Sequence, residues 1–308
     1  MARFLGWRLL RALATMLLVL LIAFATLRYS GEPFDRMFPH GVTVEHQAAL
    51  ERKWGLDQPF WAQFAAYLRG LAVGDFGRSL FTGERVWAMY AERMPATLAV
   101  GSLALLLAIA IGIPLGALSA LYRGAAGERA AMGVAFLGYA VPHFVIGIGL
   151  ILWLGYYARA LPTTGLATPA HYVLPVITLA IPMIAGLARF MRAAMLDAIA
   201  QDYAVTAESK GLAPGRIARV HILRNAMTPL ISVLGLEVAG LINGSIFVEA
   251  VFSLPGVGRI LVGAVEDRDF AVLQFGVIAY AGLVVAINLV VDCLYVAADP
   301  RVRLEQDA

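Results

Sequence analysis

Long runs of apolar residues dominate the chain and divide it into six segments that are each able to cross a membrane. A spanning helix needs ~20 mostly apolar residues to cross ~30 Å of hydrocarbon. Pro175 and Pro182 interrupt the fourth segment, but membrane helices tolerate proline when neighbouring helices satisfy the freed carbonyl groups. The pattern therefore predicts an all-α polytopic membrane protein of about six transmembrane helices. The segments run from Leu9 to Leu27, Ala96 to Leu121, Ala131 to Tyr157, Tyr172 to Leu187, Leu230 to Val251 and Val272 to Val296.

The first apolar segment also has features of a signal peptide. Arginines precede or enter it at positions 3, 8 and 11, and Ala23-Phe24-Ala25 is similar to a cleavage site. The apolar run is long for a signal peptide, however, and matches of this small-x-small kind often arise by chance. We therefore expect an uncleaved first helix, with cleavage as the alternative.

Positive charge is distributed unevenly among the connections, which predicts the orientation of the chain. If the N-terminus is cytoplasmic, basic residues outnumber acidic ones on the inside, whereas the two balance on the outside. Both termini are then cytoplasmic. The predicted domains are residues 1–28 (cytoplasmic N-terminus and first helix), 29–94 (external domain), 95–297 (membrane core, with a cytoplasmic loop at 188–229) and 298–308 (cytoplasmic tail).

The connection at residues 29–94 contains enough local signals for a small external domain between the first two helices. Thr43 is a suitable N-cap for a helix that runs through Lys53 and stops at Gly55. Pro59 suits the first turn of a second helix, and Gly-Asp-Phe-Gly at residues 74–77 is typical of a turn.

The cytoplasmic connection at residues 188–229 is longer than most connections between helices. Its middle predicts one short helix, in which Asp202 accepts the free N–H groups of the first turn and Gly211 ends the last turn after Lys210. Ala204 and Ala207 give this helix a small-residue face suited to contact with another protein; an ordinary solvated loop helix is the alternative. A basic helix follows, with these residues at its start and along it: Pro214, Arg216, Arg219, His221 and Arg224.

Composition agrees with a membrane protein and argues against several functional classes. The 308 residues are 60% hydrophobic and 15% charged, whereas soluble domains contain about 45–50% apolar and 25% charged residues. The arginines form no run of the kind that binds nucleic acid. Neither lysine, Lys53 or Lys210, completes a Gly-Lys-Ser/Thr phosphate loop, so we expect no ATPase site in this chain. The histidines lack zinc-ligand spacing, and we expect no metal or other cofactor bound by the chain.

Polar residues inside the apolar segments are candidates for contact with a solute. Glu237 lies near the middle of the fifth segment, where a charge is costly unless it is paired, protonated or hydrated. In one interpretation Glu237 and Asn243 line a translocation path. In the other, Glu237 is a protonated or arginine-paired residue at a helix contact. Structural roles are favoured for His143, Glu249, Asp292 and Cys293.

Short motifs follow one another in a fixed order along nearly the whole chain. The external ones are Gly55-Leu56-Asp57-x-Pro59 and Gly74-Asp75-Phe76-Gly77-x-Ser79, and Pro95-Ala96-Thr97-Leu98 opens the second segment. The cytoplasmic loop carries Asp202-Tyr203, Thr206-Ala207, Lys210-Gly211-Leu212, His221, Arg224-Asn225-Ala226 and Pro229. Further along lie Glu249, Phe252, Pro255-Gly256-x-Gly258, Arg268-Asp269, Asn288-Leu289, Asp292, Tyr295 and Asp299-Pro300-Arg301. This ordered set resembles the inner-membrane permeases of dipeptide, oligopeptide and nickel ABC importers; Ser30-Gly31-Glu32-Pro33 departs from that family's Pro-Gly-Asp-Pro.

The resemblance implies the fold of a type I ABC importer permease in the bacterial inner membrane. The implied function is transport of peptides or similar small solutes, with nickel chelates or glutathione as alternatives. The implied partners are a second homologous permease, two ATP-binding-cassette ATPase subunits that carry ATP and Mg, and a periplasmic or lipid-anchored substrate-binding protein. The cytoplasmic helix would couple the ATPase to the membrane helices through Asp202, Tyr203, Thr206, Ala207, Lys210, Gly211, Arg216 and Arg224.

Two pairs of glycines spaced four residues apart, Gly112 with Gly116 and Gly240 with Gly244, allow helix backbones to approach closely. We expect them at helix contacts, within the chain or between two permeases. Two other functional classes remain as alternatives. A secondary transporter would relay protons through its membrane-embedded acids and usually shows internal repeats, and a receptor or scaffold would need larger domains outside the membrane.

Overall fold

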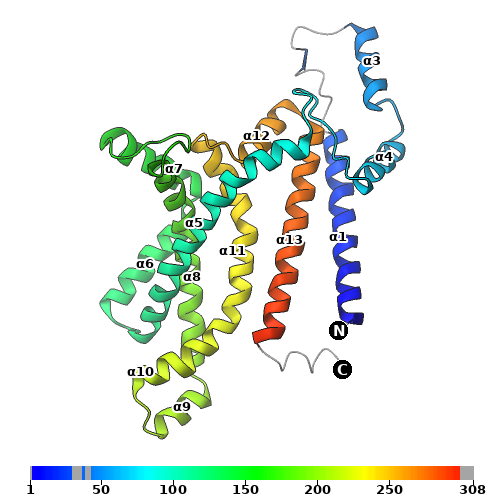
Figure 1. The fold of residues 1–308 in the computed structure, drawn as a ribbon. Coiled ribbons are helices and arrows are strands. Elements are labelled where there is room, and N and C mark those ends of the chain that lie inside the picture. Colours follow the sequence, from blue (N-terminus) through cyan, green and yellow to red (C-terminus); the bar gives the residue numbers. More distant parts are fainter. Residues whose placement is uncertain (1, 30–36, 39–42, 299–308) are drawn as a thin grey trace. The chain divides into compact units, whose positions relative to one another are not determined.

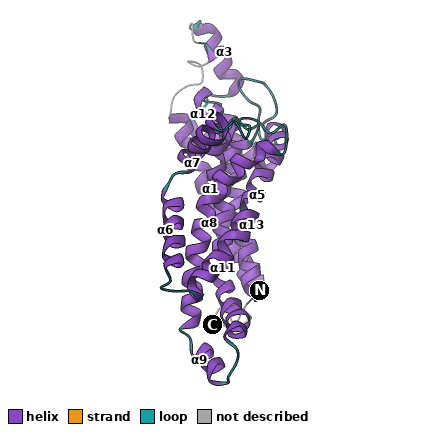
Figure 2. Cartoon of the chain, turned by 90° about the vertical axis from the view of Figure 1, so that its left-hand side faces the viewer, coloured by secondary structure: helices purple, strands orange, loops and turns teal. Residues whose placement is uncertain are grey.

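The computed structural model describes residues 2–29, 37–38 and 43–298, and within these ranges the chain is helical, with no β-strand (Figure 1, Figure 2). The motifs at Ser30–Pro33 and Asp299–Arg301, and the tail beyond Ala298, lie outside the described residues. The helices are α1 (Ala2–Tyr29), α3 (Val44–Trp54), α4 (Phe60–Ala72), α5 (Val86–Leu121), α6 (Ala126–Ala140), α7 (His143–Leu150), η1 (Ile151–Tyr157), α8 (Ala170–Ile199), α9 (Asp202–Ser209), α10 (Pro214–Arg216), η2 (Ile217–Ile222), α11 (Leu223–Val251), α12 (Val257–Asp267) and α13 (Phe270–Ala298).

Five helical stretches in the described ranges are long and apolar enough to cross a membrane, and a bent pair of helices supplies a sixth if it is one span. The proline-containing segment forms an unbroken α8 of 30 residues, with Pro175 and Pro182 inside it. This arrangement agrees with the predicted all-α polytopic fold. The five stretches are Leu10–Tyr29, Val86–Leu121, Ala170–Ile199, Pro214–Leu241 and Phe270–Val291.

The third predicted segment, Ala131 to Tyr157, is not one continuous helix. Its two halves, α6 and the pair α7 with η1, are bent by 102° at a short break. Pro142 lacks an N–H group and holds the preceding Val141 in an extended conformation (φ −84°, ψ 126°), which ends α6. The prediction of an uninterrupted third helix is therefore wrong, and the segment is a broken span or a re-entrant pair.

The helices group into two compact units, residues 1–95 with 259–285 and residues 96–258 with 286–308. The two units are defined by contacts between residues, and their bounds differ from those of the predicted external, membrane and cytoplasmic parts. The predicted division into an external domain, a membrane core and a cytoplasmic tail stays a prediction.

In the first unit, α1 and α4 share a cluster of aromatic side chains. Phe24 is buried, and its ring centroid lies 5.5 Å from that of Phe60, 5.3 Å from Phe64 and 5.6 Å from Tyr67. Such edge-to-face and stacked pairs add to the free energy of apolar burial. The helical spacing of the α4 aromatics therefore serves to pack α4 against α1.

The helix α3 begins and ends where the sequence predicts. Thr43 has an extended backbone, and its Oγ1 accepts a hydrogen bond from the backbone N–H of His46 at 3.4 Å. Gly55 follows the helix with φ 66°, the left-handed conformation that glycine adopts without steric cost. The predicted cap and stop are both confirmed.

The turn at residues 74–77 leads into a loop that is fastened to the start of α13. The side chain of Ser79 donates to the carboxylate of Asp269, which is buried immediately before α13. One turn into the same helix, the Val272 carbonyl accepts from the Tyr90 hydroxyl at 2.9 Å. Because these partners are buried and far apart in sequence, they position the start of α5 against α13.

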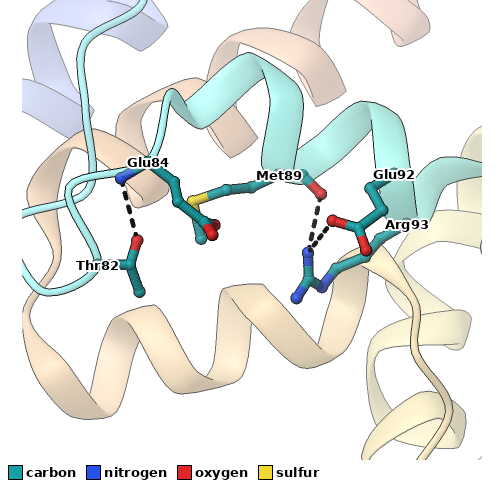
Figure 3. Close-up of polar contacts among 5 residues, drawn as sticks. All are labelled: Thr82, Glu84, Met89, Glu92 and Arg93. Carbon is teal, nitrogen blue, oxygen red and sulfur yellow. Dashed lines mark hydrogen bonds and ion pairs between the residues drawn. The ribbon is translucent and has the colours of Figure 1, made fainter.

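Polar contacts on the surface of the same region add less. Glu84 N–H donates to Thr82 Oγ1 at 3.3 Å, and Arg93 donates to the Met89 carbonyl and lies 3.5 Å from the Glu92 carboxylate (Figure 3). The Glu92 side chain is 78% exposed, and exposed ion pairs contribute only ~0–1 kcal/mol. The buried contacts to α13 therefore carry most of the stabilisation here.

In the second unit, α8 packs against α6, α7 and α11 and forms the centre of the core. Leu174, Leu187 and Met191 on this helix are fully buried. The buried positions recur along the length of α8, so one helix organises the others around it. Residues of α6 and α11 are thereby brought next to residues of α8 that lie far from them in sequence.

The glycine pair on α5 contacts α8 inside the same chain. A Cβ atom on Gly112 would lie 2.9 Å from the carbonyl oxygen of Ile184, and one on Gly116 would overlap the carbonyl oxygen of Ala188. These glycines therefore allow α5 and α8 to approach within the second unit. The pair on α11 differs, since a Cβ on Gly240 would have no atom within 4 Å, whereas one on Gly244 would contact Leu179 and His143.

Candidate functional site

The short helix α9 and the turn that follows it lie in the middle of the predicted cytoplasmic loop, residues 188–229. Gly211 adopts φ 74° directly after Lys210, as expected for a left-handed stop. Its N–H donates to the Glu208 carbonyl at 2.8 Å, and the N–H of Leu212 donates to the Ala207 carbonyl at 3.3 Å. These two bonds form a Schellman motif, which satisfies carbonyl groups that the last turn of a helix leaves free.

The start of α9 differs from the prediction. Gln201, with an extended backbone (ψ 150°), is the N-cap residue, and no side chain makes a capping hydrogen bond there. Asp202 is the first residue inside the helix, and its carbonyl accepts from the Thr206 hydroxyl at 2.8 Å. Asp202 is thus not the N-cap. Its negative charge still lies in the first turn, where the helix dipole favours an anion.

The two faces of α9 have opposite environments. Ala204 and Ala207 are buried against their own chain, in a cluster with Met195 and Ala198 of α8 and Ile217 of η2. Tyr203 and Leu212 are half-buried and pack at the edge of the same cluster. The prediction that the alanine face is presented to another protein is therefore wrong, because the small residues are what let α9 lie close to its own helices.

The outward face of α9 is the surface left for a partner. Val205 is 58% exposed, and Thr206, Glu208, Ser209, Lys210 and Gly211 are exposed as well. A single exposed valine among polar residues is ordinary for a protein surface, so this face is distinguished by its exposure beside a buried face and not by an apolar patch. In Figure 1 and Figure 2, α9 lies at the end of the second unit opposite α7.

The basic helix after α9 continues without a break into a membrane-spanning helix. Pro214 occupies the first helical position, as predicted, and α10, η2 and α11 follow one another directly from Pro214 to Val251. Arg216 and Arg224 are exposed on this run. The helix that contains the predicted fifth segment therefore begins at Pro214, well before Leu230, and the basic helix and that segment are one helical element.

An ion pair that the sequence analysis missed fastens the neighbouring helices. Arg192 on α8 lies 2.9 Å from the carboxylate of Glu128 on α6, and that carboxylate also accepts from the N–H of Gly124 at 3.3 Å. Only 6% of the Glu128 side chain is exposed. Local sequence carries no signal for this pair, because its members are 64 residues apart.

The predicted path residues lie on α11. Glu237 is half-buried, and its Oε1 would lie 3.2 Å from a Cβ on Gly186 of α8. Asn243 belongs to α11 by its backbone, but its side chain lies outside the described residues, as do those of Asp292 and Cys293. His143 faces α11 too, with its Nε2 3.4 Å from where a Cβ on Gly244 would lie.

Glu249 forms the centre of a buried hydrogen-bond network at the turn between α11 and α12. It accepts from the Thr97 hydroxyl at 2.7 Å and from the N–H of Gly258 at 2.6 Å. The Thr97 hydroxyl in turn accepts from the N–H of Val257 at 2.9 Å. A Cβ on Gly256 would overlap the carboxylate, which explains the glycine there. The favoured structural role of Glu249 is confirmed by these contacts.

We expect Thr97→Val to destabilise the protein by about 1–3 kcal/mol. Valine keeps the shape of threonine but has no hydroxyl group. The buried Glu249 carboxylate therefore loses a hydrogen-bond donor, and the Val257 N–H loses its acceptor. The midpoint of thermal unfolding of the detergent-purified protein measures the effect. Ser102→Ala on the same helix is the control, because the Ser102 hydroxyl is exposed and bonds only to the Ala99 carbonyl of its own turn. Equal midpoints for the two variants would contradict a stabilising role for the network.

No group of three or more histidine, cysteine, aspartate or glutamate side chains suited to a metal ion occurs among residues 2–29, 37–38 and 43–298. In the second unit, Glu128 is paired with arginine, Glu249 accepts from hydroxyl and backbone donors, and Glu237 lies beside a glycine. The arrangement supports packing, docking and contact with a solute.

Two family models match the chain and together cover most of it. Residues 112–304 match the "Binding-protein-dependent transport system inner membrane component" family, and residues 1–101 match the N-terminal part of such membrane components.

Curated relatives of similar length extend this finding. The dipeptide transport system permease protein DppB of Escherichia coli K12 is 34% identical over 98% of this chain and 99% of its own length. The oligopeptide transport system permease protein OppB of Haemophilus influenzae is 34% identical over 98% of this chain and 100% of its own. The glutathione transport system permease protein GsiC of Shigella flexneri is 35% identical over 96% of this chain and 97% of its own.

Solved structures share the fold. A chain of the inward-facing MetNI methionine ABC transporter has a TM-score of 0.58 at 18% identity, over 70% of this chain and 99% of that one. A chain of an amino acid ABC transporter crystallised with histidines has a TM-score of 0.54 at 19% identity, over 68% of this chain and 93% of that one. At these identities the likeness concerns the fold alone.

Proposed function

We propose a function from one premise: this chain belongs to the family of binding-protein-dependent transport system inner membrane components, the permease subunits of ABC importers. It is a multi-pass protein of the bacterial inner membrane and a transport component rather than an enzyme. Such permeases work with ATPase and substrate-binding partners. The substrate, the composition of the complex and the residues that couple its parts form the proposal.

The proposed complex contains this chain, a second homologous permease, two ATP-binding-cassette subunits and a periplasmic or lipid-anchored binding protein. ATP and Mg bind to the ATPase subunits in this proposal, since the chain has no phosphate loop. Both termini face the cytoplasm, as the distribution of arginines favours. The loop that contains α9 then lies on the ATPase side of the membrane.

The observation that carries the proposal is the construction of α9. It is a short helix with a defined stop, fixed to its own chain by Ala204 and Ala207, with Val205 and its polar neighbours exposed on the other face. A helix held on one side and exposed on the other is suited to dock into a second protein without changing shape. We assign the ATPase contact to Tyr203, Thr206, Lys210 and Gly211, with Asp202, Ala207, Arg216 and Arg224 as residues that support the loop.

Transmission follows from the continuity between the loop and the membrane helix. The helical run from Pro214 to Val251 starts three residues after Gly211, so a displacement of α9 is passed to α11 with little slack. Closure of the ATPases would then draw the loops of the two permeases together and open the path outward. Glu237 and Asn243 line the path in this proposal, because both belong to α11.

Peptides are the proposed substrate. The relatives named for dipeptide, oligopeptide and glutathione transport are all about equally similar to this chain, so their names favour small peptides as a class. Glutathione is itself a modified tripeptide, and nickel chelates are the alternative without peptide character.

ATP-dependent uptake by the reconstituted complex tests the function. Proteoliposomes that contain both permeases and both ATPases, with binding protein outside and ATP inside, are expected to accumulate labelled dialanine or glutathione. Omission of ATP, or of the ATPase subunits, should abolish the uptake. Uptake that persists without them would support a secondary transporter, and uptake of a nickel chelate alone would replace the peptide assignment.

A further inference from the structure

Three helices of the second unit bring a charged and an aromatic side chain to one glycine. Gly186 lies in α8, and a Cβ there would be 3.2 Å from Oε1 of Glu237 on α11 and 3.8 Å from the ring of Tyr139 on α6. A Cβ at this position would contact the Tyr139 ring and would crowd the Glu237 carboxylate, so glycine lets both groups approach the backbone of α8. The carboxylate and the ring are therefore neighbours, although Tyr139 and Glu237 are 98 positions apart in the sequence.

A positive charge lies beside the same ring. Arg189, one turn after Gly186 on α8, places its guanidinium carbon 4.0 Å from the centroid of the Tyr139 ring. The Nε of Arg189 is buried and makes no hydrogen bond within the described part of the chain. The cation is thus held by the aromatic face, an attraction that strengthens where water is excluded.

The two opposite charges do not pair with each other. Among the described residues, the ion pairs of this unit include Arg192 with Glu128 but none between Arg189 and Glu237, and Glu237 makes no hydrogen bond either. An unpaired carboxylate inside a membrane helix costs several kcal/mol unless something compensates its charge. A direct ion pair between Arg189 and Glu237 would have neutralised both charges within the protein. Because the two groups do not pair, each is able to bind a ligand group of the opposite charge.

We propose that Glu237, Arg189 and Tyr139, gathered around Gly186, form a contact site for a zwitterionic solute during its passage through the membrane. The Glu237 carboxylate receives the ammonium group of the solute, and Arg189 receives its carboxylate by leaving the ring of Tyr139. The inference rests on the proposed transport function and narrows it to solutes with a free amino group and a free carboxylate. Dialanine and glutathione share both groups, whereas a metal chelate without an ammonium group lacks the first.

Equilibrium binding to the complete permease–ATPase complex in nanodiscs, without binding protein, tests the site directly. Labelled dialanine is expected to bind saturably, with competition by unlabelled dialanine and none by N-acetyl-dialanine at the same concentration. Glu237→Gln and Arg189→Gln should each weaken binding by at least about tenfold, because each replaces an ion-paired hydrogen bond with a weaker one that lacks the protein's charge. The acetylated competitor needs no variant, so the test holds even where a variant fails to assemble.

A pair of glycine substitutions provides the matched control. Gly186→Ala should weaken dialanine binding by a few fold, because the new Cβ crowds the Glu237 carboxylate at 3.2 Å. Gly240→Ala on α11 should leave binding unchanged, since nothing lies within 4 Å of its Cβ. Equal effects of the two alanines would mean that the site is not organised around Gly186.

The outcomes separate this inference from the function on which it rests. ATP-driven uptake of dialanine together with no saturable binding, or with equal competition by the acetylated peptide, would overturn the site and leave the importer intact. Full binding and uptake by Glu237→Gln and Arg189→Gln would overturn it as well. Absence of ATP-driven uptake of both dialanine and glutathione would instead remove the proposed substrate class.

Discussion

Replacing Gly211 with proline is expected to abolish the stimulation of ATP hydrolysis by loaded binding protein, while the membrane-spanning helices stay folded. Gly211 adopts φ 74° and donates its N–H to the Glu208 carbonyl. Proline is confined to φ near −65° and has no N–H, a conflict that costs ~3 kcal/mol or more in a helical setting. The Schellman turn must then open, and the docked arrangement of α9 should lose roughly two orders of magnitude in population.

The readout is ATPase activity of the reconstituted complex, with and without loaded binding protein, after assembly has been checked by size-exclusion chromatography. Gly215→Ala is the control in the same loop, because its Cβ would meet only the tip of the Arg219 side chain at 4.0 Å and its φ is not left-handed. We expect that control to retain coupling. If an assembled Gly211→Pro complex kept full stimulation, the loop would be a simple connection and would not transmit motion.

Alanine at Gly116 is expected to prevent stable folding of the second unit. The added Cβ would overlap the carbonyl oxygen of Ala188 and lie 2.7 Å from the Cβ of Met191, and neither of these atoms is able to rotate away. Overpacking in a protein interior usually costs about 1–3 kcal/mol, and a clash with a backbone atom belongs at the upper end of that range or beyond. Inside a membrane the loss is more serious, since close packing is a main source of helix association there.

A graded series of variants checks this expectation. Gly112→Ala should destabilise less, because its Cβ would lie 2.9 Å from the Ile184 carbonyl oxygen. Gly133→Ala on α6 should be neutral or slightly stabilising, since no atom lies within 4 Å and alanine favours helix. The temperature at which half of the detergent-purified protein aggregates should fall in the order Gly133→Ala, Gly112→Ala, Gly116→Ala. Similar temperatures for all three would show that α5 and α8 do not depend on close contact.

Local chemistry explains why much of the fold was predictable. The apolar segments, the cap at Thr43 and the stops at Gly55 and Gly211 depend on residues near each other in sequence, so a single segment contains the whole signal. Local sequence does not show whether a proline will lie inside a continuous helix or at a sharp bend. Pro175 and Pro182 lie within the unbroken α8, whereas Pro142 coincides with a bend of 102°. Neighbouring helices decide whether the freed groups are satisfied.

The candidate site was predictable only in part for the same reason. The loop was found, but the direction of its alanine face was not, because periodicity shows that Ala204 and Ala207 share a face without showing what covers it. Glu237 was found as a costly charge in an apolar segment. Its neighbours Tyr139, Gly186 and Arg189 carry no local signal, since a tyrosine, a glycine and an arginine each have many ordinary roles.

Sequence alone determined that this protein is a helical membrane protein, where the short helix α9 stops and which family motifs the chain carries. These properties follow from hydropathy, backbone preference and the order of short motifs, all of which act over a few residues. Tertiary structure decided the pairing of Arg192 with Glu128, the burial of Glu249 and the meeting of Glu237 with Gly186. Each of these depends on the register of one helix against another, and register is set by the fit of many side chains at once.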